Sequence, residues 1–336
     1  MFGKFITTGI GSMPHTDPGS ACEIILEKVD IPFWPQLPGL SFRELMIPQY
    51  SEGLPSARID VDRQRIWVER NGASELNDFY ETYTDNTELE ISEDYSRGFY
   101  QFIEKIRGRK FPVLKGQVTG PLTFTLGLKD DAGVPIYFNE EMREVALMVL
   151  KGKVRWQMNR LREFCDRLMI FIDEPILSAL GTSSYMGVSD GEVKRLLGEI
   201  VESIRNENGI SAIHCCGKAD WEMVMKTGID VVNFDAYDYF ENFRIYSGVL
   251  SDFLERGGYI AWGIVPTGIV IDEVDTDSLK DKFLRQFDAL SERVGGRLTP
   301  ERLILTPACG AGSLREDQAE QVFDTLYLLK QRLLNG

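Results

Sequence analysis

The stretch LMIFIDEPILSALGTSSYMGVSDGEVKRLLGEIVESIRNENGISAIHCC (168–216) contains one complete unit of the expected fold. It begins with the apolar run LMIFI (168–172) and ends in a second run, GISAIHC (209–215), and each run predicts a short buried strand. Between them, Ser189 and Asp190 open an amphipathic segment, which is the pattern of a capped helix. A strand, a helix and a second strand in this order predict that the two strands lie parallel.

The same alternation extends over almost the whole chain. Further apolar runs that predict buried strands lie at 5–10, 33–37, 111–118, 231–236, 259–265 and 302–307. Helix-like segments lie at about 18–29, 92–108, 139–166, 189–206, 217–227, 246–256, 276–294 and 314–334. Eight strand-then-helix units predict an α/β protein with a (β/α)8 TIM barrel, in which residues 1–336 form a single domain. The segment at 55–70 breaks the alternation and predicts a β-hairpin, inserted after the second strand and able to cover one mouth of the barrel.

Composition argues against several classes of partner. The chain has 37 Lys and Arg against 52 Asp and Glu, a net charge of −15, and no cluster of basic residues, so nucleic acid is not an expected partner. No apolar run approaches the roughly 20 residues that span a bilayer, and the first residues lack the pattern of a secretory signal. We therefore expect a cytoplasmic protein without a membrane partner, whose five cysteines are thiols or metal ligands rather than disulfides.

Chemically distinctive residues follow the ends of the predicted strands. Because the carboxyl ends of parallel barrel strands share one face, residues that are far apart in the sequence should converge there. The groups concerned are Gly9 to Pro14, Lys115 to Pro121, Asp173 to Pro175, His214 to Cys216, Asp235, and Cys309 with Gly310.

The run at 214–216 indicates a metal site. Side chains two residues apart in a strand share a side, so His214 and Cys216 should point the same way and Cys215 into the packing around the barrel. Imidazole and thiolate together favour Zn²⁺, which usually takes four ligands, and Cys309 can supply the third. The candidates for the fourth are Asp235, Glu241 and an exchangeable water. The alternative is that the histidine and the cysteines are ordinary core residues.

A zinc ion with two thiolate ligands is a poor Lewis acid for hydrolysis, because the thiolates already donate much charge. Such a site is better suited to binding an incoming thiol as thiolate, at a pH where the free thiol, with a pKa of about 8.5, is mostly protonated. The ligand pattern therefore favours alkyl transfer to a thiol over ester or peptide hydrolysis.

Five motifs, taken together and in order, resemble those of a known family. They are GIGSMP (9–14), KGQVTGP (115–121), IDEP (172–175), HCCG (214–217) and PACG (307–310). The set resembles the carboxyl-terminal catalytic barrel of cobalamin-independent methionine synthase, in the superfamily that also holds the zinc thiol methyltransferases of methanogens and uroporphyrinogen decarboxylase. The resemblance covers nearly the whole chain. It implies the zinc ligands His214, Cys216 and Cys309, with Asp235 at the position of the family's glutamate ligand.

The resemblance also implies homocysteine as the substrate. Asp173 matches the family's ammonium-binding aspartate and is the residue that we assign to the catalytic site. The backbone of Ile10, Gly11 and Ser12 matches the family's carboxylate-binding loop. Glu81, in LNDFYETY (76–83), resembles part of an N-D-x-x-E-Y motif and implies a second acid at the substrate. The alternatives are helix capping for Asp173 and turn chemistry alone for Gly11, Gly120 and Pro121.

The chain departs from the family in the part that binds folate. It has no room for the family's second barrel, and Gly127 stands where the family has a tryptophan that stacks on the pterin. The segment WGIVPTGIVID (262–272) lacks the family's histidine, which leaves Asp272 or Glu273 as the acid if a folate were used. These departures predict methylcobalamin or a methylated corrinoid protein as the methyl donor.

Zinc-dependent methylation of homocysteine to methionine is the predicted activity, and three alternatives stay open. The first is methylation of another thiol such as coenzyme M, for which an ammonium-binding Asp173 would be needless. The second is a lyase like uroporphyrinogen decarboxylase, which needs several arginines near the first strand, where the candidate stretch offers only Arg43. The third is a protein that is not an enzyme, in which zinc holds the barrel together or a methylated carrier binds for regulation.

Overall fold

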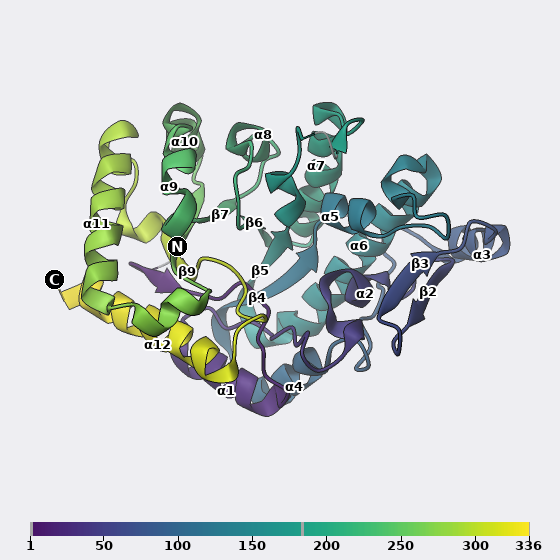
Figure 1. Cartoon of the computed structure of the whole chain (residues 1–336), viewed down its shortest axis with the longest axis horizontal. Coiled ribbons are helices and arrows are strands. Elements are labelled where there is room, and N and C mark those ends of the chain that lie inside the picture. The colour runs from purple at the N-terminus through teal and green to yellow at the C-terminus, as the bar shows by residue number, and fades with distance from the viewer. Residues whose placement is uncertain (1–2, 183–184, 336) are drawn as a thin grey trace.

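The computed structural model describes residues 3–182 and 185–335, and a curled parallel sheet lies at its centre (Figure 1). The sheet has seven strands in the order β1-β9-β8-β7-β6-β5-β4. Their bounds are β1 Ile6–Thr7, β4 Phe111–Thr119, β5 Cys165–Asp173, β6 Ile210–Cys215, β7 Val231–Asp235, β8 Tyr259–Val265 and β9 Leu303–Pro307. Every pairing is parallel. The α/β class and the parallel sheet are confirmed, in the form of a half-barrel.

Eight barrel strands were predicted, and the sheet has seven in the described residues. The missing one is the predicted second strand, residues 33–37, which forms no strand. Pro32 and Pro35 have no N–H to donate, so a continuous ladder cannot form there. The segment lies between β1 and β4 and makes single contacts with each side. The N–H of Gln36 donates to the Gly11 carbonyl at 3.0 Å, and the N–H of Lys115 donates to the Pro32 carbonyl at 2.8 Å.

Helices surround the curled sheet (Figure 1). Eight match the predicted segments: α1 Pro18–Lys28, α4 Arg97–Ile106, α6 Glu140–Leu161, α7 Asp190–Asn206, α8 Trp221–Met225, α10 Ser247–Glu255, α11 Thr276–Arg293 and α12 Glu316–Asn335. Four shorter helices were not predicted: α2 Met46–Ser51, α3 Ala73–Thr82, α5 Pro121–Gly127 and α9 Ala236–Arg244. None of the described helices is both long and apolar enough to cross a membrane.

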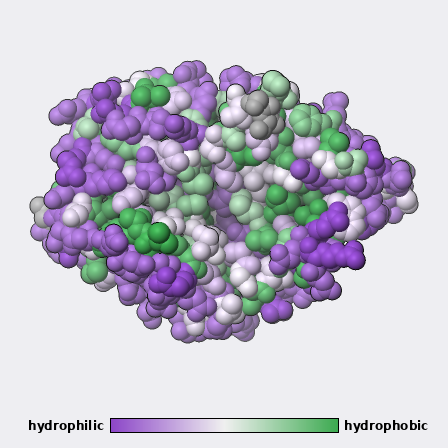
Figure 2. Space-filling view, viewed as in Figure 1, coloured by the Kyte–Doolittle hydropathy of each residue, from purple (hydrophilic) through white to green (hydrophobic). Residues whose placement is uncertain are grey.

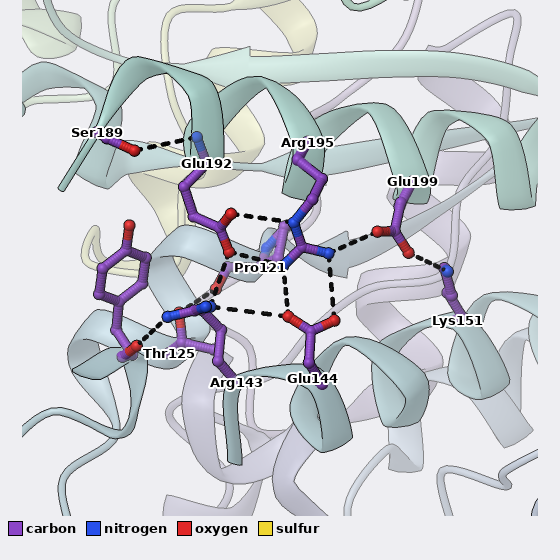
Figure 3. A network of polar contacts seen from close by, with 10 residues as sticks. Pro121, Thr125, Arg143, Glu144, Lys151, Ser189, Glu192, Arg195 and Glu199 are labelled. Carbon is purple, nitrogen blue, oxygen red and sulfur yellow. Dashed lines mark hydrogen bonds and ion pairs between the residues drawn. The ribbon is translucent and has the colours of Figure 1, made fainter. Parts of the chain in front are cut away.

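Ion pairs join α6, the helix before β5, to α7, the helix after it (Figure 3). Arg195 of α7 pairs with Glu192 at 2.6 Å and Glu199 at 2.6 Å on its own helix, and also with Glu144 of α6. Arg143 of α6 reaches Glu192 at 2.8 Å. The side chain of Ser189 caps α7, as the sequence predicted. The network fixes the start of α7 against α6.

A separate antiparallel pair lies within the range predicted for the hairpin. β2 Ala57–Asp60 pairs with β3 Arg65–Val68. Together with α3 the pair lies at one end of the molecule in Figure 1. None of its residues lines the cavity described below, so the structure does not place it over that opening. The hairpin was predicted to follow a second strand. Residues 33–37 form no strand, so this part of the prediction is not confirmed.

Side chains alternate between two apolar cores. The inward-facing residues of the strands form a small cluster inside the half-barrel that includes Met169, Phe171, Ala212 and Val231. The residues between them, such as Ile170, pack outward against the helices in a much larger cluster. Because successive side chains point to opposite faces, the same alternation determines which residues just beyond the strand ends face the interior of the half-barrel.

Candidate metal centre

A row of polar side chains continues the inward faces of three adjacent strands. Asp173 follows Phe171 by two residues on β5, and it lies in register with His214 of β6. His214 in turn lies in register with Asn233 of β7. All three are almost fully buried, with exposed fractions of 9%, 3% and 0%. The apolar interior of the half-barrel is therefore closed at this end by a polar layer.

Hydrogen bonds around Asn233 determine which nitrogen of His214 carries a proton. The Asn233 amide donates both of its hydrogens, to the Ala261 carbonyl at 2.9 Å and to Thr306 Oγ1 at 2.9 Å. Its Oδ1 must therefore accept, and the group beside it is His214 Nδ1. This assigns the hydrogen of the neutral ring to Nδ1. Nε2 is buried and has no hydrogen-bond partner in the described residues, so its lone pair is available to a ligand.

His214, Cys216 and Cys309 form a three-residue cluster that can hold a metal. One ligand atom from each lies within 4.8 Å of the others. Tetrahedral zinc with bonds of 2.0–2.3 Å needs ligand atoms about 3.5 Å apart, so small side-chain rotations close the cluster. The neighbouring Cys309 and His214 side chains lower the pKa of the Cys216 thiol, although burial raises it. The donor set and the unpartnered Nε2 both fit a zinc ion.

The position of Cys215 agrees with the sequence analysis. Its side chain belongs to the outer core and not to the cluster. Burial raises the pKa of Cys215 to about 12, so it stays a protonated thiol at neutral pH.

Cys309 is held in place by the close packing of its loop on the loop after β1. The hydroxyl of Ser12 accepts from the N–H of Gly312 at 3.3 Å, and the Ser12 carbonyl accepts from the N–H of Ala311 at 2.9 Å. A Cβ atom on Gly310 would lie 2.1 Å from the Ser12 hydroxyl oxygen. A side chain at this position would require the Ser12 hydroxyl to move, so the glycine favours the close packing of the loops that follow the neighbouring strands β1 and β9.

Asp173 does not cap a helix, so the structural alternative for this residue is wrong. Its Oδ1 is buried without a hydrogen-bond partner among the described residues. Burial raises the pKa of Asp173, while His214 and Lys115 lower it. The neighbouring Glu174 does the capping: its carboxylate accepts from the N–H groups of Leu122 and Thr123, both at 2.8 Å, at the start of α5. The Oδ1 of Asp173 therefore stays able to accept a hydrogen bond from a ligand.

A fully buried lysine lies in the interior near Asp173. Lys115 Nζ donates to the Ile10 carbonyl at 2.5 Å and to Gln117 Oε1 at 3.2 Å. Burial lowers the pKa of Lys115, and the charge on Asp173 opposes that shift. The ammonium also faces the rings of Phe171 at 4.6 Å and Phe33 at 5.0 Å.

A cavity of about 380 Å³ opens beside the cluster. It brings together six of the residues that the sequence analysis selected: Ile10, Ser12, Asp173, His214, Cys216 and Cys309. Pro38, Leu45, Met46 and Pro175 supply an apolar wall, and no lysine or arginine lines the cavity. Figure 2 shows a hollow near the centre of this face with hydrophobic residues at its rim. The size and the lining suit a small molecule rather than a polymer.

Three other candidate residues lie outside the cluster. Asp235 is buried, but its Oδ1 accepts from the N–H of Asp238 at 2.9 Å and so caps α9. Glu241 lies on the same helix and pairs with Arg244 at 2.5 Å. Glu81 is exposed on α3, at the far end of the molecule from the sheet (Figure 1), so the structure does not bring it to the cavity. A fourth ligand from the protein stays a prediction.

The supporting residues around the cluster had no role in the sequence-based prediction: Lys115 and Glu174 were named only as strand-end residues, and Asn233 and Thr306 were not selected. Asn233 and Thr306 orient His214, Lys115 holds Ile10, and Glu174 anchors α5. One signal was available: Asn233 and Lys115 are polar residues that follow the inward-facing Val231 and Val113 by two positions.

Comparisons with known proteins give a likeness of fold. No protein-family model matches the chain, and no curated protein matches it. The chain is similar to the solved structure of a methyltransferase from Methanosarcina mazei, with a TM-score of 0.53 and 11% identity over 97% of this chain and 94% of the other. It is also similar to a B12-independent methionine synthase from Shewanella sp. W3-18-1 in complex with selenomethionine, with a TM-score of 0.57 and 15% identity over 99% of this chain and all of the other.

Proposed function

We propose that this protein is a zinc-dependent methyltransferase that converts homocysteine to methionine. The observation that carries the proposal is the buried, unpartnered Nε2 of His214 beside two cysteine thiols, at the wall of a small cavity. The likeness of fold to a methyltransferase and to a methionine synthase supports the reaction class. We place the protein in the cytoplasm, in line with its sequence.

The residues of the cluster suit a metal that exchanges one ligand. His214, Cys216 and Cys309 would hold zinc, and zinc bound there would make an incoming thiol available as thiolate at neutral pH. Cys216 and Cys309 are only partly buried and line the cavity, so a substrate can approach from that side. This accessibility favours a catalytic site over a zinc ion that only stabilises the fold.

The charges at the cavity favour an amino-acid thiol. Asp173 offers an unpaired carboxylate oxygen for the ammonium of homocysteine. Coenzyme M carries a sulfonate and no ammonium, so it would leave the Asp173 oxygen without a partner. A porphyrinogen carries several carboxylates and would need several cations in the cavity wall. The candidate arginine, Arg43, pairs with Asp94 at 3.2 Å and does not line the cavity.

The methyl donor that we propose is methylcobalamin or a methylated corrinoid protein. Gly127 packs against Ile47, where a Cβ atom would lie 2.4 Å from its Cδ1, so no stacking side chain is available at that position. Asp272 accepts from Gln318 at 2.9 Å, and neither it nor Glu273 lines the cavity. A methyl-folate would need an acid to protonate its leaving nitrogen, and a well-placed acid contributes roughly 10²–10⁴ in rate.

The proposal is tested by metal content and methionine formation together. We expect about one zinc per chain in the wild type and in Cys215→Ala, and loss of most zinc in Cys309→Ala. Methionine should form from homocysteine with methylcobalamin and not with methyltetrahydrofolate, mono- or polyglutamylated. Full zinc in Cys309→Ala would disprove the metal site, and faster turnover with the folate would disprove the corrinoid donor.

A further inference from the structure

We propose that Lys115 is a positioning residue that turns the backbone amide of Gly11 toward the cavity, where that amide binds the carboxylate of an amino-acid thiol. The inference rests on the proposed function and assigns a role to a residue that does not touch the substrate. It explains why an ammonium group is buried inside an otherwise apolar half-barrel.

The geometry of one peptide carries the argument. A trans peptide is planar, so its C=O and N–H groups point in opposite directions. The Ile10 carbonyl accepts from Lys115 Nζ, which is fully buried and does not line the cavity. The N–H of the same peptide, which belongs to Gly11, therefore points away from the buried lysine. Ile10 and Ser12 on either side both line the cavity, and in the described residues the Gly11 N–H donates to no other group.

A lysine suits this position because its positive charge can balance the negative charge of a carboxylate bound in the cavity. A carboxylate bound at the Gly11 amide would lie in a cavity that has no lysine or arginine in its wall. Burial lowers the pKa of Lys115 to about 7, and in its protonated form Lys115, in the interior below, would balance this charge as it does that of Asp173. Gln117 and the rings of Phe33 and Phe171 keep its side chain in one position. A methionine could fill the same space but could not hold the Ile10 carbonyl.

The experiment separates the carboxylate contact from the ammonium contact. Protein loaded with Co²⁺ in place of zinc reports thiol binding by its thiolate-to-cobalt absorption. Four thiols are titrated: homocysteine, 4-mercaptobutanoate without the ammonium, 3-aminopropane-1-thiol without the carboxylate, and 1-propanethiol without either. Lys115→Met should weaken the two carboxylate-bearing thiols by about tenfold or more and change the others less than about twofold. The matched variant Asp173→Asn should weaken the two amine-bearing thiols instead.

A second measurement uses the wild type alone, so it does not depend on how well a variant folds. Ile-Gly occurs once in the chain, at Ile10 and Gly11. Zinc-loaded protein with carbonyl-¹³C isoleucine and ¹⁵N glycine therefore gives one selected amide signal, that of Gly11. The signal should shift with homocysteine and 4-mercaptobutanoate and stay in place with 1-propanethiol.

The outcomes distinguish this inference from the proposed function. An equal loss for all four thiols in Lys115→Met, or a Gly11 signal that responds equally to 1-propanethiol, would give Lys115 a structural role only and overturn the inference. A wild type that holds the metal and binds none of the four thiols would instead overturn the proposed function.

Discussion

The imidazole of His214 is oriented by a residue that does not touch the proposed metal. Asn233 accepts from Nδ1 because its own two hydrogens are committed to Ala261 and Thr306. Without this contact the ring could exchange its tautomer or rotate, and Nε2 would no longer be held toward the cysteines. Outer contacts of this kind typically change metal affinity by 10–100-fold.

We predict that Asn233→Ala lowers zinc affinity by about 10–100-fold, whereas Asn233→Asp, which keeps an acceptor oxygen, retains most of it. The affinity is measured by competition with a chromogenic chelator. Thr306→Val is the matched control, because it removes only the second contact in the chain of hydrogen bonds and should have a smaller effect. Equal affinities for Asn233→Ala and the wild type would show that His214 needs no orienting partner.

At this scale the sequence predicted the residues that face the cavity and not those that support them. His214, Cys216, Cys309 and Asp173 were recognisable because histidine and cysteine are rare in the chain and because strand ends converge. Glu81 was selected from a short match alone, and the structure leaves it exposed on α3. Capping by Asp235 could not be foreseen either, because the same residue type serves a metal or a helix end equally well.

At the scale of elements, α5 and β5 are joined by a buried carboxylate. Glu174 accepts from two N–H groups of α5 and from the Thr123 hydroxyl at 2.6 Å. Gly120 makes this approach possible, since a Cβ atom there would lie 2.1 Å from the Glu174 carboxyl carbon. The glycine has an ordinary φ of −65°, so it is needed for space and not for a special turn.

Gly120→Ala should therefore lower the free energy of unfolding by about 1–3 kcal/mol, the usual cost of overpacking a core. The matched control is Gly198→Ala in α7, where a new Cβ atom meets nothing within 4 Å. That substitution should raise the stability by about 0.5–1 kcal/mol, because glycine disfavours a helix. Urea denaturation followed by circular dichroism measures both. A neutral Gly120→Ala would mean that Glu174 can move aside without loss.

Helices and strands were predicted well where apolar residues recur at one regular spacing along the whole element. Long segments such as α6 and α11 were found to within a few residues, apart from an overlong end at 166. The segment at 33–37 was mistaken for a strand because its apolar residues suit a sheet while its prolines prevent the ladder. The short helices α2, α5 and α9 were missed because so few residues carry little periodicity, although α8 and α10, of similar length, were found.

For the molecule as a whole, stability should depend on pH through buried carboxyl groups. Glu44 is fully buried and accepts from the N–H groups of Leu37 and Arg97, both at 3.2 Å. Burial raises the pKa of Glu44 from 4.5 to about 7, although the two hydrogen bonds lower it. Between these two values the folded protein binds more protons than the unfolded chain. The free energy of unfolding therefore falls as the pH rises from about 4.5 to about 7.

We predict that Glu44→Gln removes this part of the pH dependence. The loss of stability between pH 5 and pH 8 should be smaller in the variant than in the wild type by on the order of 3 kcal/mol, from a difference of about 2.5 pKa units. Urea midpoints at the two pH values, with the slopes checked for equality, provide the measurement. The same loss in both proteins would show that Glu44 is already ionised at pH 5.

The order of the ligands along the chain has a consequence for biosynthesis. His214 and Cys216 leave the ribosome early, whereas Cys309 lies in the loop after β9, the last strand of the sheet. The loop that holds Cys309 also packs on Ser12, because β9 pairs with β1, so the cluster needs segments that lie far apart in the sequence. A nascent chain would thus carry an incomplete chelate until Cys309 has been translated. If the cluster binds zinc as proposed, a chain that ends before Cys309 would hold the metal with two ligands in place of three and so more weakly.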